Sequence, residues 1–172
     1  ILSPCQAMVK IVESEMGKTL NANVIPYPID GKYFHQISSK YCNPKKSKIL
    51  ILFASRNDPV KGGELFINVL KQLNGNYTSA IRVDFYGYKP QQDISYMPFV
   101  QTNGFVTKDK LDSVYEKADI CVIPSIFDNS PNTVYEAMAS GKIVIASAVG
   151  GIPEIIGGSE NGYLFDKNDI ND

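Results

Sequence analysis

The chain has few residues of the kinds that build disulfide, metal-centred or covalent sites. Its 172 residues include three cysteines, Cys5, Cys42 and Cys121, and a single histidine, His35. The cysteines are odd in number and show no paired spacing, which disfavours a disulfide framework or a zinc site and favours reduced thiols. Cys121 lies in an apolar run and is expected to be inert core. A histidine-based zinc site or a Ser-His-Asp triad would have to use His35, which lies in a polar, loop-like stretch.

Strong charge of one sign and long apolar runs are also absent. The formal net charge is −1, which indicates neither a nucleic-acid partner nor an anionic membrane surface. No apolar run approaches the ~20 residues needed to span a bilayer, and no signal peptide is visible. The chain has no Asp-x-Asp pair, which disfavours a metal-dependent site. No G-x-G-x-x-G motif follows a strand, so a dinucleotide-dependent dehydrogenase is also disfavoured. Length and composition predict one soluble globular domain.

What the sequence does contain is a regular alternation of apolar strands and amphipathic helices. Apolar runs predict strands at residues 48–54, 81–86, 100–102, 119–124, 143–147 and 162–165. Apolar residues at helical spacing predict helices at residues 64–73, 107–118, 131–140 and 154–156. Short links between such elements imply right-handed βαβ units. The predicted fold class is therefore α/β, a Rossmann-like open parallel sheet with helices on both faces.

The first residues are expected to belong to a different unit from this alternation. Ser3 predicts the N-cap of a helix, with Pro4 at its first position and Gln6 completing a capping box, and Gly17 ends the helix. The helix precedes a turn-rich connector rather than a strand of the alternation. Residues 32–47 are polar and irregular, and we expect a connecting loop with solvated lysines. Both ends of the chain also look cut from something longer.

One strand–loop–helix junction is the most informative stretch. The apolar run 120–123 leads into a polar loop, and a helical pattern then runs from Pro131 to a stop at Gly141. Ligands of open α/β sheets bind outside the carboxyl ends of the strands, and a helix N-terminus suits a phosphate. Asp128 precedes the helix and Glu136 lies inside it. Ionised carboxylates accept hydrogen bonds from sugar hydroxyls, so the pair suggests a ligand with both hydroxyls and phosphates.

Several of these residues have a second interpretation that the pattern leaves open. Arg56 and Lys61 follow the first strand of the alternation and suit phosphate, but they could equally be surface cations. Glu136 could be an exposed helix residue, and Asp128 could be a turn or cap residue. Residues 150–151 are glycines that could serve only a tight turn.

Six ordered motifs carry a resemblance to one enzyme family. They are Arg56 with residues 61–63, residues 104–106, residues 118–120, residues 124–125, Asp128 with residues 136–141, and residues 150–156. In this order they resemble the C-terminal, nucleotide-sugar-binding domain of a GT-B glycosyltransferase of the large retaining family often called GT4, glycosyl transferases group 1. The resemblance implies one half of a GT-B fold. It also implies that residues 1–30 are the hinge helix and linker from a missing N-terminal domain, and that residues 31–172 are the donor-binding domain without its C-terminal helices.

The resemblance assigns three residues to the chemistry of sugar transfer. Arg56 and Lys61 would bind the donor diphosphate and offset its negative charge as the nucleotide leaves, and Asp128 would face the transferred sugar. The family is usually described by two glutamates with seven residues between them. Here Asp128 stands in the first place, one methylene shorter, and Glu136 follows eight positions later. The family needs no metal, and in its front-face mechanism the leaving phosphate assists the acceptor.

The resemblance assigns four more residues to binding the nucleotide. Glu136 would bond the ribose hydroxyls, main-chain N–H groups near Asn132 and Thr133 would hold the phosphates, and Val106 would border the base. A second departure from the family is Pro131, where glycine is common. Proline suits the first position of a helix, so the phosphate site should survive.

The expected function is that of a donor-binding domain in a retaining glycosyltransferase. The full-length enzyme would move a hexose from a UDP- or GDP-linked donor to a glycan or lipid-linked acceptor held by the missing N-terminal domain, without a metal or other cofactor. The resemblance suggests polysaccharide biosynthesis in the cytoplasm, with peripheral membrane association of the full-length protein left open. The isolated chain should bind nucleotide weakly and transfer little or nothing. Alternatives are a non-catalytic nucleotide-binding module and another GT-B-type enzyme, such as a sugar-nucleotide epimerase or a phosphorylase.

Overall fold

The computed structural model describes residues 1–29, 47–73 and 75–166. Most of the predicted connector, with His35 and Cys42, lies outside the described residues, as do the boundary between residues 30 and 31 and the last six residues. Within the described part, no helix is both long enough and apolar enough to cross a membrane.

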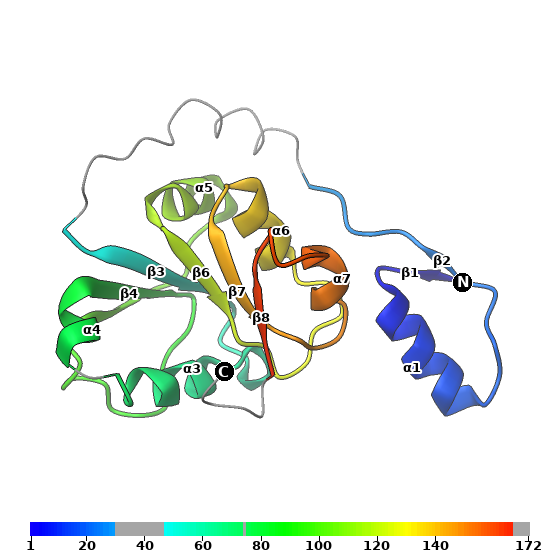
Figure 1. The fold of residues 1–172 in the computed structure, drawn as a ribbon, viewed down its shortest axis with the longest axis horizontal. Coiled ribbons are helices and arrows are strands. Elements are labelled where there is room, and N and C mark those ends of the chain that lie inside the picture. The colour runs from blue at the N-terminus through cyan, green and yellow to red at the C-terminus, as the bar shows by residue number, and fades with distance from the viewer. Residues whose placement is uncertain (30–46, 74, 167–172) are drawn as a thin grey trace.

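A six-stranded sheet forms the centre of the molecule (Figure 1). Its strands are β3 (Ile49–Ala54), β4 (Ile81–Tyr86), β5 (Val100–Asn103), β6 (Ile120–Ile123), β7 (Ile143–Ser147) and β8 (Tyr163–Phe165). The order across the sheet is β5-β4-β3-β6-β7-β8, and each neighbouring pair is parallel. The strand order therefore reverses between β3 and β6, where Ile51 pairs with Val83 on one side and Ile120 on the other. Such a reversal opens a crevice at the carboxyl ends of the two strands.

Helices cover both faces of this sheet, as the sequence predicted. They are α3 (Gly63–Leu70), α4 (Gly75–Ala80), α5 (Lys108–Lys117), α6 (Asn132–Ala139) and α7 (Ile152–Ile156), with a short 3-10 helix, η1 (Pro59–Lys61), before α3. One core cluster joins α5, α6 and α7 to the face that carries Leu52. The other joins α3 to the opposite face, where Phe53 packs against Phe85 with ring centroids 5.1 Å apart. Because neighbouring strand residues face opposite layers, both layers bury apolar side chains.

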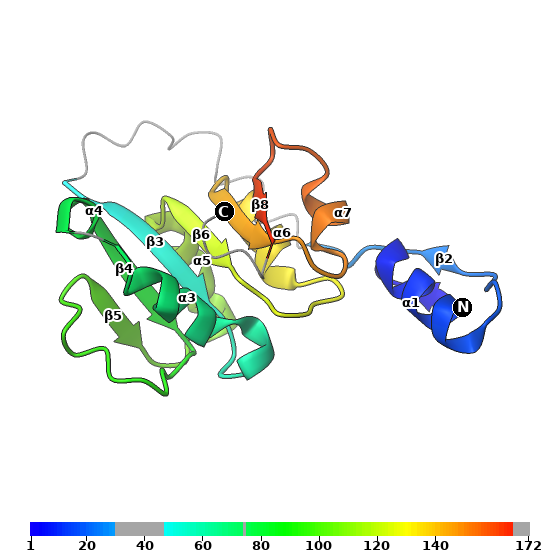
Figure 2. The ribbon, with the colours of Figure 1, turned by 60° about the horizontal axis from the view of Figure 1, so that its bottom comes forward.

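Residues 1–29 form a separate small unit. In it β1 (Leu2–Ser3) and β2 (Asn23–Val24) pair in parallel, and α1 (Gln6–Met16) connects them. Figure 2 shows this unit at the α7 end of the molecule. The two strands make a sheet of their own rather than joining the six-stranded one.

The predicted start of α1 was wrong. Ser3 lies in a strand, Cys5 occupies the N-cap position without a side-chain cap, and the helix begins at Gln6. The Ser3 hydroxyl donates instead to the carbonyl of Cys5 at 2.8 Å. Pairing with β2 holds Ser3 in an extended conformation, which takes precedence over the local capping pattern. The predicted stop was confirmed, because Gly17 has φ 61° in the left-handed region.

The remaining errors concern helix ends and one additional helix. Helix α3 ends at Leu70 rather than residue 73, and α4 occupies a stretch for which no helix was predicted. Pro131 is the N-cap of α6 with an extended backbone, so the first helical residue is Asn132. Strands β4 and β7 have the predicted bounds.

Candidate active site

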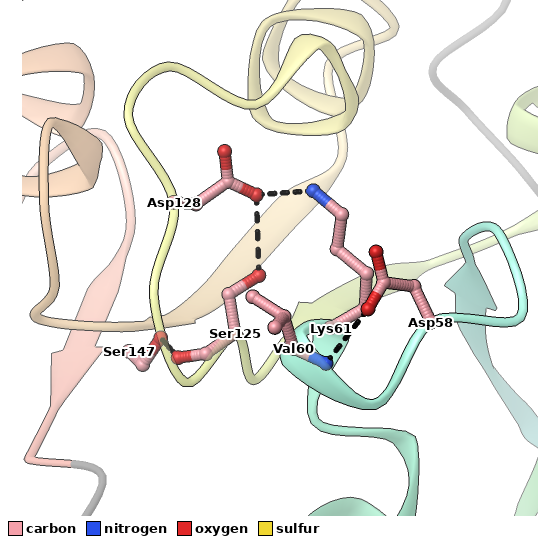
Figure 3. Close-up of polar contacts among 6 residues, drawn as sticks. All are labelled: Asp58, Val60, Lys61, Ser125, Asp128 and Ser147. Carbon is pink, nitrogen blue, oxygen red and sulfur yellow. Dashed lines mark hydrogen bonds and ion pairs between the residues drawn. The ribbon is translucent and has the colours of Figure 1, made fainter.

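An ion pair joins two loops at the carboxyl edge of the sheet (Figure 3). Lys61 Nζ lies 2.5 Å from Asp128 Oδ2, and the two side chains are only 22% and 11% exposed. Ser125 Oγ makes a long contact of 3.5 Å to the same carboxylate oxygen. Opposite charges interact more strongly where water is partly excluded, so this pair is more firmly held than one on an open surface.

The loop after β3 is shaped to present Lys61. The Asp58 side chain accepts from the backbone N–H of Val60 at 3.0 Å and caps η1, and the Lys61 N–H donates to the carbonyl of Asp58 at 3.0 Å. Gly62 then turns the chain with φ +72°. A Cβ atom at Gly62 would lie 1.7 Å from the carbonyl oxygen of Pro124, so only glycine allows the two loops to approach this closely.

The loop after β6 is held from two sides. On one side the Ile126 N–H donates to the carbonyl of Val60 at 2.8 Å. On the other, the Gly151 N–H donates to the carbonyl of Asp128 at 3.1 Å. Gly150 has φ +54°, and a Cβ atom there would lie 1.7 Å from the same Asp128 oxygen. Residues 150–151 are therefore glycines because they pack directly on the backbone that carries Asp128, in addition to forming a turn.

A small pocket opens where the strand order reverses. It is lined by Phe53, Ala54, Ser55, Lys61, Val122, Ile123, Pro124, Ser125 and Thr133. Thr133 is the second residue of α6, and first-turn N–H groups of a helix have no partners within the helix. The pocket therefore combines a cation with the positive end of a helix, an arrangement that suits an anionic group.

Glu136 lies one turn further along α6 and is half-buried. Its Oε2 accepts a hydrogen bond from the Tyr115 hydroxyl at 3.0 Å. The pKa of Glu136 is raised, mainly because burial desolvates its carboxylate, and the negative charge of Asp112 adds to the rise. The hydrogen bond from Tyr115 and the positive charge of Lys108 partly oppose it. The interpretation of Glu136 as a freely exposed helix residue was wrong, because a neighbouring helix orients its carboxylate.

Residues 48–172 match the sequence profile of the family described as glycosyl transferases group 1. The chain belongs to this family. Two relatives illustrate the similarity. The uncharacterized glycosyltransferase MJ1607 of Methanocaldococcus jannaschii is 35% identical over 128 residues, which cover 69% of this chain and 32% of the relative. The sulfoquinovosyl transferase SQD2 of Arabidopsis thaliana is 32% identical over 138 residues, which cover 76% of this chain and 26% of the relative.

A solved structure supports the fold assignment. HepE of Anabaena, solved in complex with UDP, superimposes with a TM-score of 0.74 at 20% identity and covers 99% of this chain and 52% of that one. The predicted fold class, one half of a GT-B fold with an open parallel sheet, is therefore confirmed. The chain spans about a third or less of the two relatives and about half of the HepE chain.

Within this group 1 domain, the structure brings together some of the predicted site residues. Lys61 and Thr133 line the pocket, Asp128 is bonded to Lys61, and Asn132 is the exposed first residue of α6.

Arg56 and Val106 are not among the residues that line the pocket. Arg56 is exposed in the loop after β3. Val106 is half-buried after β5 and packs against the core cluster that contains Tyr115. In the described part of the chain, no group of three or more His, Cys, Asp or Glu side chains could hold a metal ion.

Three contributors to the site were missed by sequence reasoning. Ser125 reaches Asp128, Asp58 shapes the turn before Lys61, and Tyr115 holds Glu136. The ring of Tyr115 is buried in the core cluster that α5 shares with α6 and α7. The signal that could have found it is the hydroxyl itself, since a buried tyrosine usually bonds a polar partner.

Proposed function

We propose that this chain is the donor-binding domain of a retaining glycosyltransferase that moves a hexose from a UDP- or GDP-linked donor to a glycan or lipid-linked acceptor. Membership of glycosyl transferases group 1 supports sugar transfer. The observation that carries the proposal is the Lys61–Asp128 pair, which lies beside the N-terminus of α6 at the point where the strand order reverses. HepE, which has the same fold, was solved with UDP and with UDP-glucose, and this supports a nucleotide-sugar donor.

In this proposal the donor diphosphate binds between Lys61 and the start of α6. The N–H groups of Asn132 and Thr133 donate to phosphate oxygens, and Arg56 adds a second cation from the rim of the site. These groups stabilise the charge that develops as the nucleotide leaves, a role that a divalent ion has in other enzymes. We therefore propose that neither a metal nor another cofactor is needed.

The ion pair gives Asp128 a role that depends on the donor. Without a ligand, Asp128 provides the counter-charge of Lys61. When a diphosphate binds, it competes for the same ammonium group and leaves the carboxylate to accept hydrogen bonds from hydroxyls of the transferred sugar. Glu136 binds the ribose hydroxyls, and Val106 borders the base. The leaving phosphate takes the proton of the attacking acceptor hydroxyl, so no protein nucleophile is required.

The acceptor is bound in this proposal by a second domain, and the 172-residue chain alone binds nucleotide weakly and transfers little or nothing. The proposed enzyme is cytoplasmic, with peripheral association at the inner face of the membrane where the acceptor is lipid-linked. Polysaccharide assembly is the proposed context.

Calorimetric titration of UDP, GDP and ADP tests the proposal. We expect saturable binding of UDP or GDP that is weakened about 10- to 100-fold in Lys61→Ala, since a hydrogen bond to a charged group contributes ~1.5–3 kcal/mol. Glu136→Ala should weaken binding of the nucleoside diphosphate as well. Lys10→Ala, which removes an exposed lysine of α1, is the matched control and should leave affinity unchanged.

The alternatives give different results in the same titration. Failure of all three nucleotides to bind would refute the donor-binding proposal. Binding that is unchanged in Lys61→Ala and Glu136→Ala would favour a nucleotide-binding module with another site. An epimerase would convert the sugar of a UDP-linked donor without an acceptor, which product analysis detects.

A further inference from the structure

Helix α1 begins with a contact to the far end of the chain. The N–H of Gln6 donates to Glu154 Oε2 at 2.7 Å, and the N–H of Ala7 donates to Glu154 Oε1 at 2.6 Å. Cys5, at the N-cap position, provides no side-chain cap. One carboxylate in the first turn of α7 therefore satisfies two first-turn N–H groups of α1, with its charge at the positive end of that helix.

An apolar contact accompanies this polar one. Cys5 is 2% exposed, and a Cβ atom at Gly151 would lie 2.7 Å from the Cys5 Cβ and 2.9 Å from its Sγ. The absent side chain of Gly151 is what allows Cys5 to pack here. In both Figure 1 and Figure 2, α7 is the neighbour of the unit formed by residues 1–29. The unit is thus docked by a packed side chain and by a charge-assisted cap.

The segment that docks α1 also holds the candidate active site. The Gly151 N–H donates to the carbonyl of Asp128, and Gly150 packs on the same carbonyl. Asp128 in turn binds Lys61. Residues 150–154 therefore contact the N-terminal unit on one side and the Asp128 loop on the other.

We infer that Glu154 is a positioning residue that fixes residues 1–29 to the loop carrying Asp128. It couples the placement of α1 to the geometry of the Lys61–Asp128 pair. A coupling of this kind is reciprocal: a ligand that engages Lys61 changes how firmly α1 is docked, to the same extent that docking changes the affinity for the ligand. The docking of α1 and its coupling to Asp128 are inferred from the contacts of residues 150–154. Only the consequence for sugar transfer rests on the proposed function.

Amide hydrogen exchange by NMR on the full 172-residue chain tests the docking. In Glu154→Gln the charge is lost and one good acceptor remains, and in Glu154→Ala both bonds are lost. We expect exchange at Gln6 and Ala7 to accelerate by about threefold in the first variant and about tenfold in the second, because the first loses only the charge and the second loses both cap interactions. Glu160→Gln, a nearby exposed carboxylate, is the matched control and should leave these rates unchanged.

The same spectra test the coupling. We expect the amide signal of Asp128 and the ammonium signal of Lys61 to shift in Glu154→Ala but not in Glu160→Gln. Faster exchange in α1 with unmoved Asp128 and Lys61 signals would overturn the coupling and leave Glu154 as a helix cap. Unchanged exchange in both Glu154 variants would overturn the docking as well. Retained far-ultraviolet circular dichroism establishes that each variant is folded.

Titration with UDP separates this inference from the proposed function. If wild type binds neither UDP nor GDP, the proposed function fails, whereas the exchange and shift data recorded without nucleotide still decide the role of Glu154. If UDP binds, saturation should change the exchange rates of Gln6 and Ala7 in wild type and have no such effect in Glu154→Ala. Binding without any change at these amides would overturn the reciprocal coupling.

Discussion

Replacing Asp128 by asparagine should tighten the binding of UDP and, in the full-length enzyme, slow sugar transfer. The Asp128 carboxylate lies 2.5 Å from Lys61 and neutralises its charge. A diphosphate that binds Lys61 must first displace this carboxylate and also meets its negative charge. Asparagine is similar in size and can still accept a hydrogen bond from Lys61, but it carries no charge to compete with the phosphates.

The size of the effect follows from the burial of the pair. At ~3 Å and an effective dielectric constant of ~20, two unit charges attract by ~5 kcal/mol, most of which is offset by their desolvation. With side chains 22% and 11% exposed, a net ~1 kcal/mol is reasonable, between typical surface and buried pairs. Removing that competition should lower the Kd for UDP about fivefold. The free energy of unfolding should fall by ~1 kcal/mol, because Lys61 loses its counter-charge.

Calorimetry of a double-mutant cycle measures this competition directly. Wild type, Asp128→Asn, Lys61→Ala and the double variant are titrated with UDP at one ionic strength, because phosphate contacts are screened by salt. The gain from Asp128→Asn should be smaller when Lys61 is absent, because the substitution then removes only the direct repulsion between Asp128 and the phosphates. Glu116→Gln, which removes one negative charge from the last turn of α5, should not change affinity. Weaker UDP binding in Asp128→Asn, or an equal gain with and without Lys61, would refute the competition.

Three further predictions concern burial, crowding and metal ions. Glu136→Gln should raise the melting temperature at pH 7 by about 1–3 °C while weakening UDP binding, because the raised pKa of Glu136 means that its charged form destabilises the fold. The gain in melting temperature should disappear below the ordinary pKa of 4.5, where the carboxyl group is protonated in both states. A gain that persists at that pH would contradict this reasoning. Gly150→Ala should lower the free energy of unfolding by ~3 kcal/mol, because the added Cβ would crowd the backbone of Asp128. Gly17→Ala is the control and should cost ~1 kcal/mol, because Gly17 also has a positive φ but no atom lies within 4 Å of an added Cβ. Equal losses of stability in urea titrations would exclude crowding against Asp128. The affinity for UDP should be the same in EDTA and in Mg²⁺, and a strong Mg²⁺ requirement would refute the cation and helix-terminus site.

The strands were the most predictable part of the fold. The apolar runs of β4 and β7 gave their bounds directly, because a strand buried on both faces needs several consecutive apolar residues. Helix starts were less predictable. The prediction of Ser3 as the N-cap of α1 was wrong, because strand pairing holds Ser3 in an extended conformation. Glu154, which lies 148 residues beyond Gln6, caps the helix instead. Helix α4 was missed because its sequence from Gly75 to Ala80 buries no side chain and so carries no apolar periodicity.

Candidate site residues could be named from the sequence, but the contacts between them could not. Lys61 and Asp128 lie in loops that follow strands, and Glu136 lies one turn into a helix; these positions can be read from local patterns. That Lys61 and Asp128 are bonded to each other, across 67 residues, could not be read from the sequence. Nor could the orientation of Glu136 by Tyr115, since it depends on how α5 and α6 pack on one face of the sheet.

By itself, the sequence determined the order of strands and helices, the α/β class and membership of glycosyl transferases group 1, because apolar periodicity and ordered motifs are properties of local sequence. Only the tertiary structure decided which of the polar residues at the strand ends meet. The reversal of strand order between β3 and β6 brings two distant loops together, and Gly62 and Gly150 let backbones approach closely enough to pair Lys61 with Asp128. The same packing places α1 against Glu154, a contact between parts of the chain that no local pattern connects.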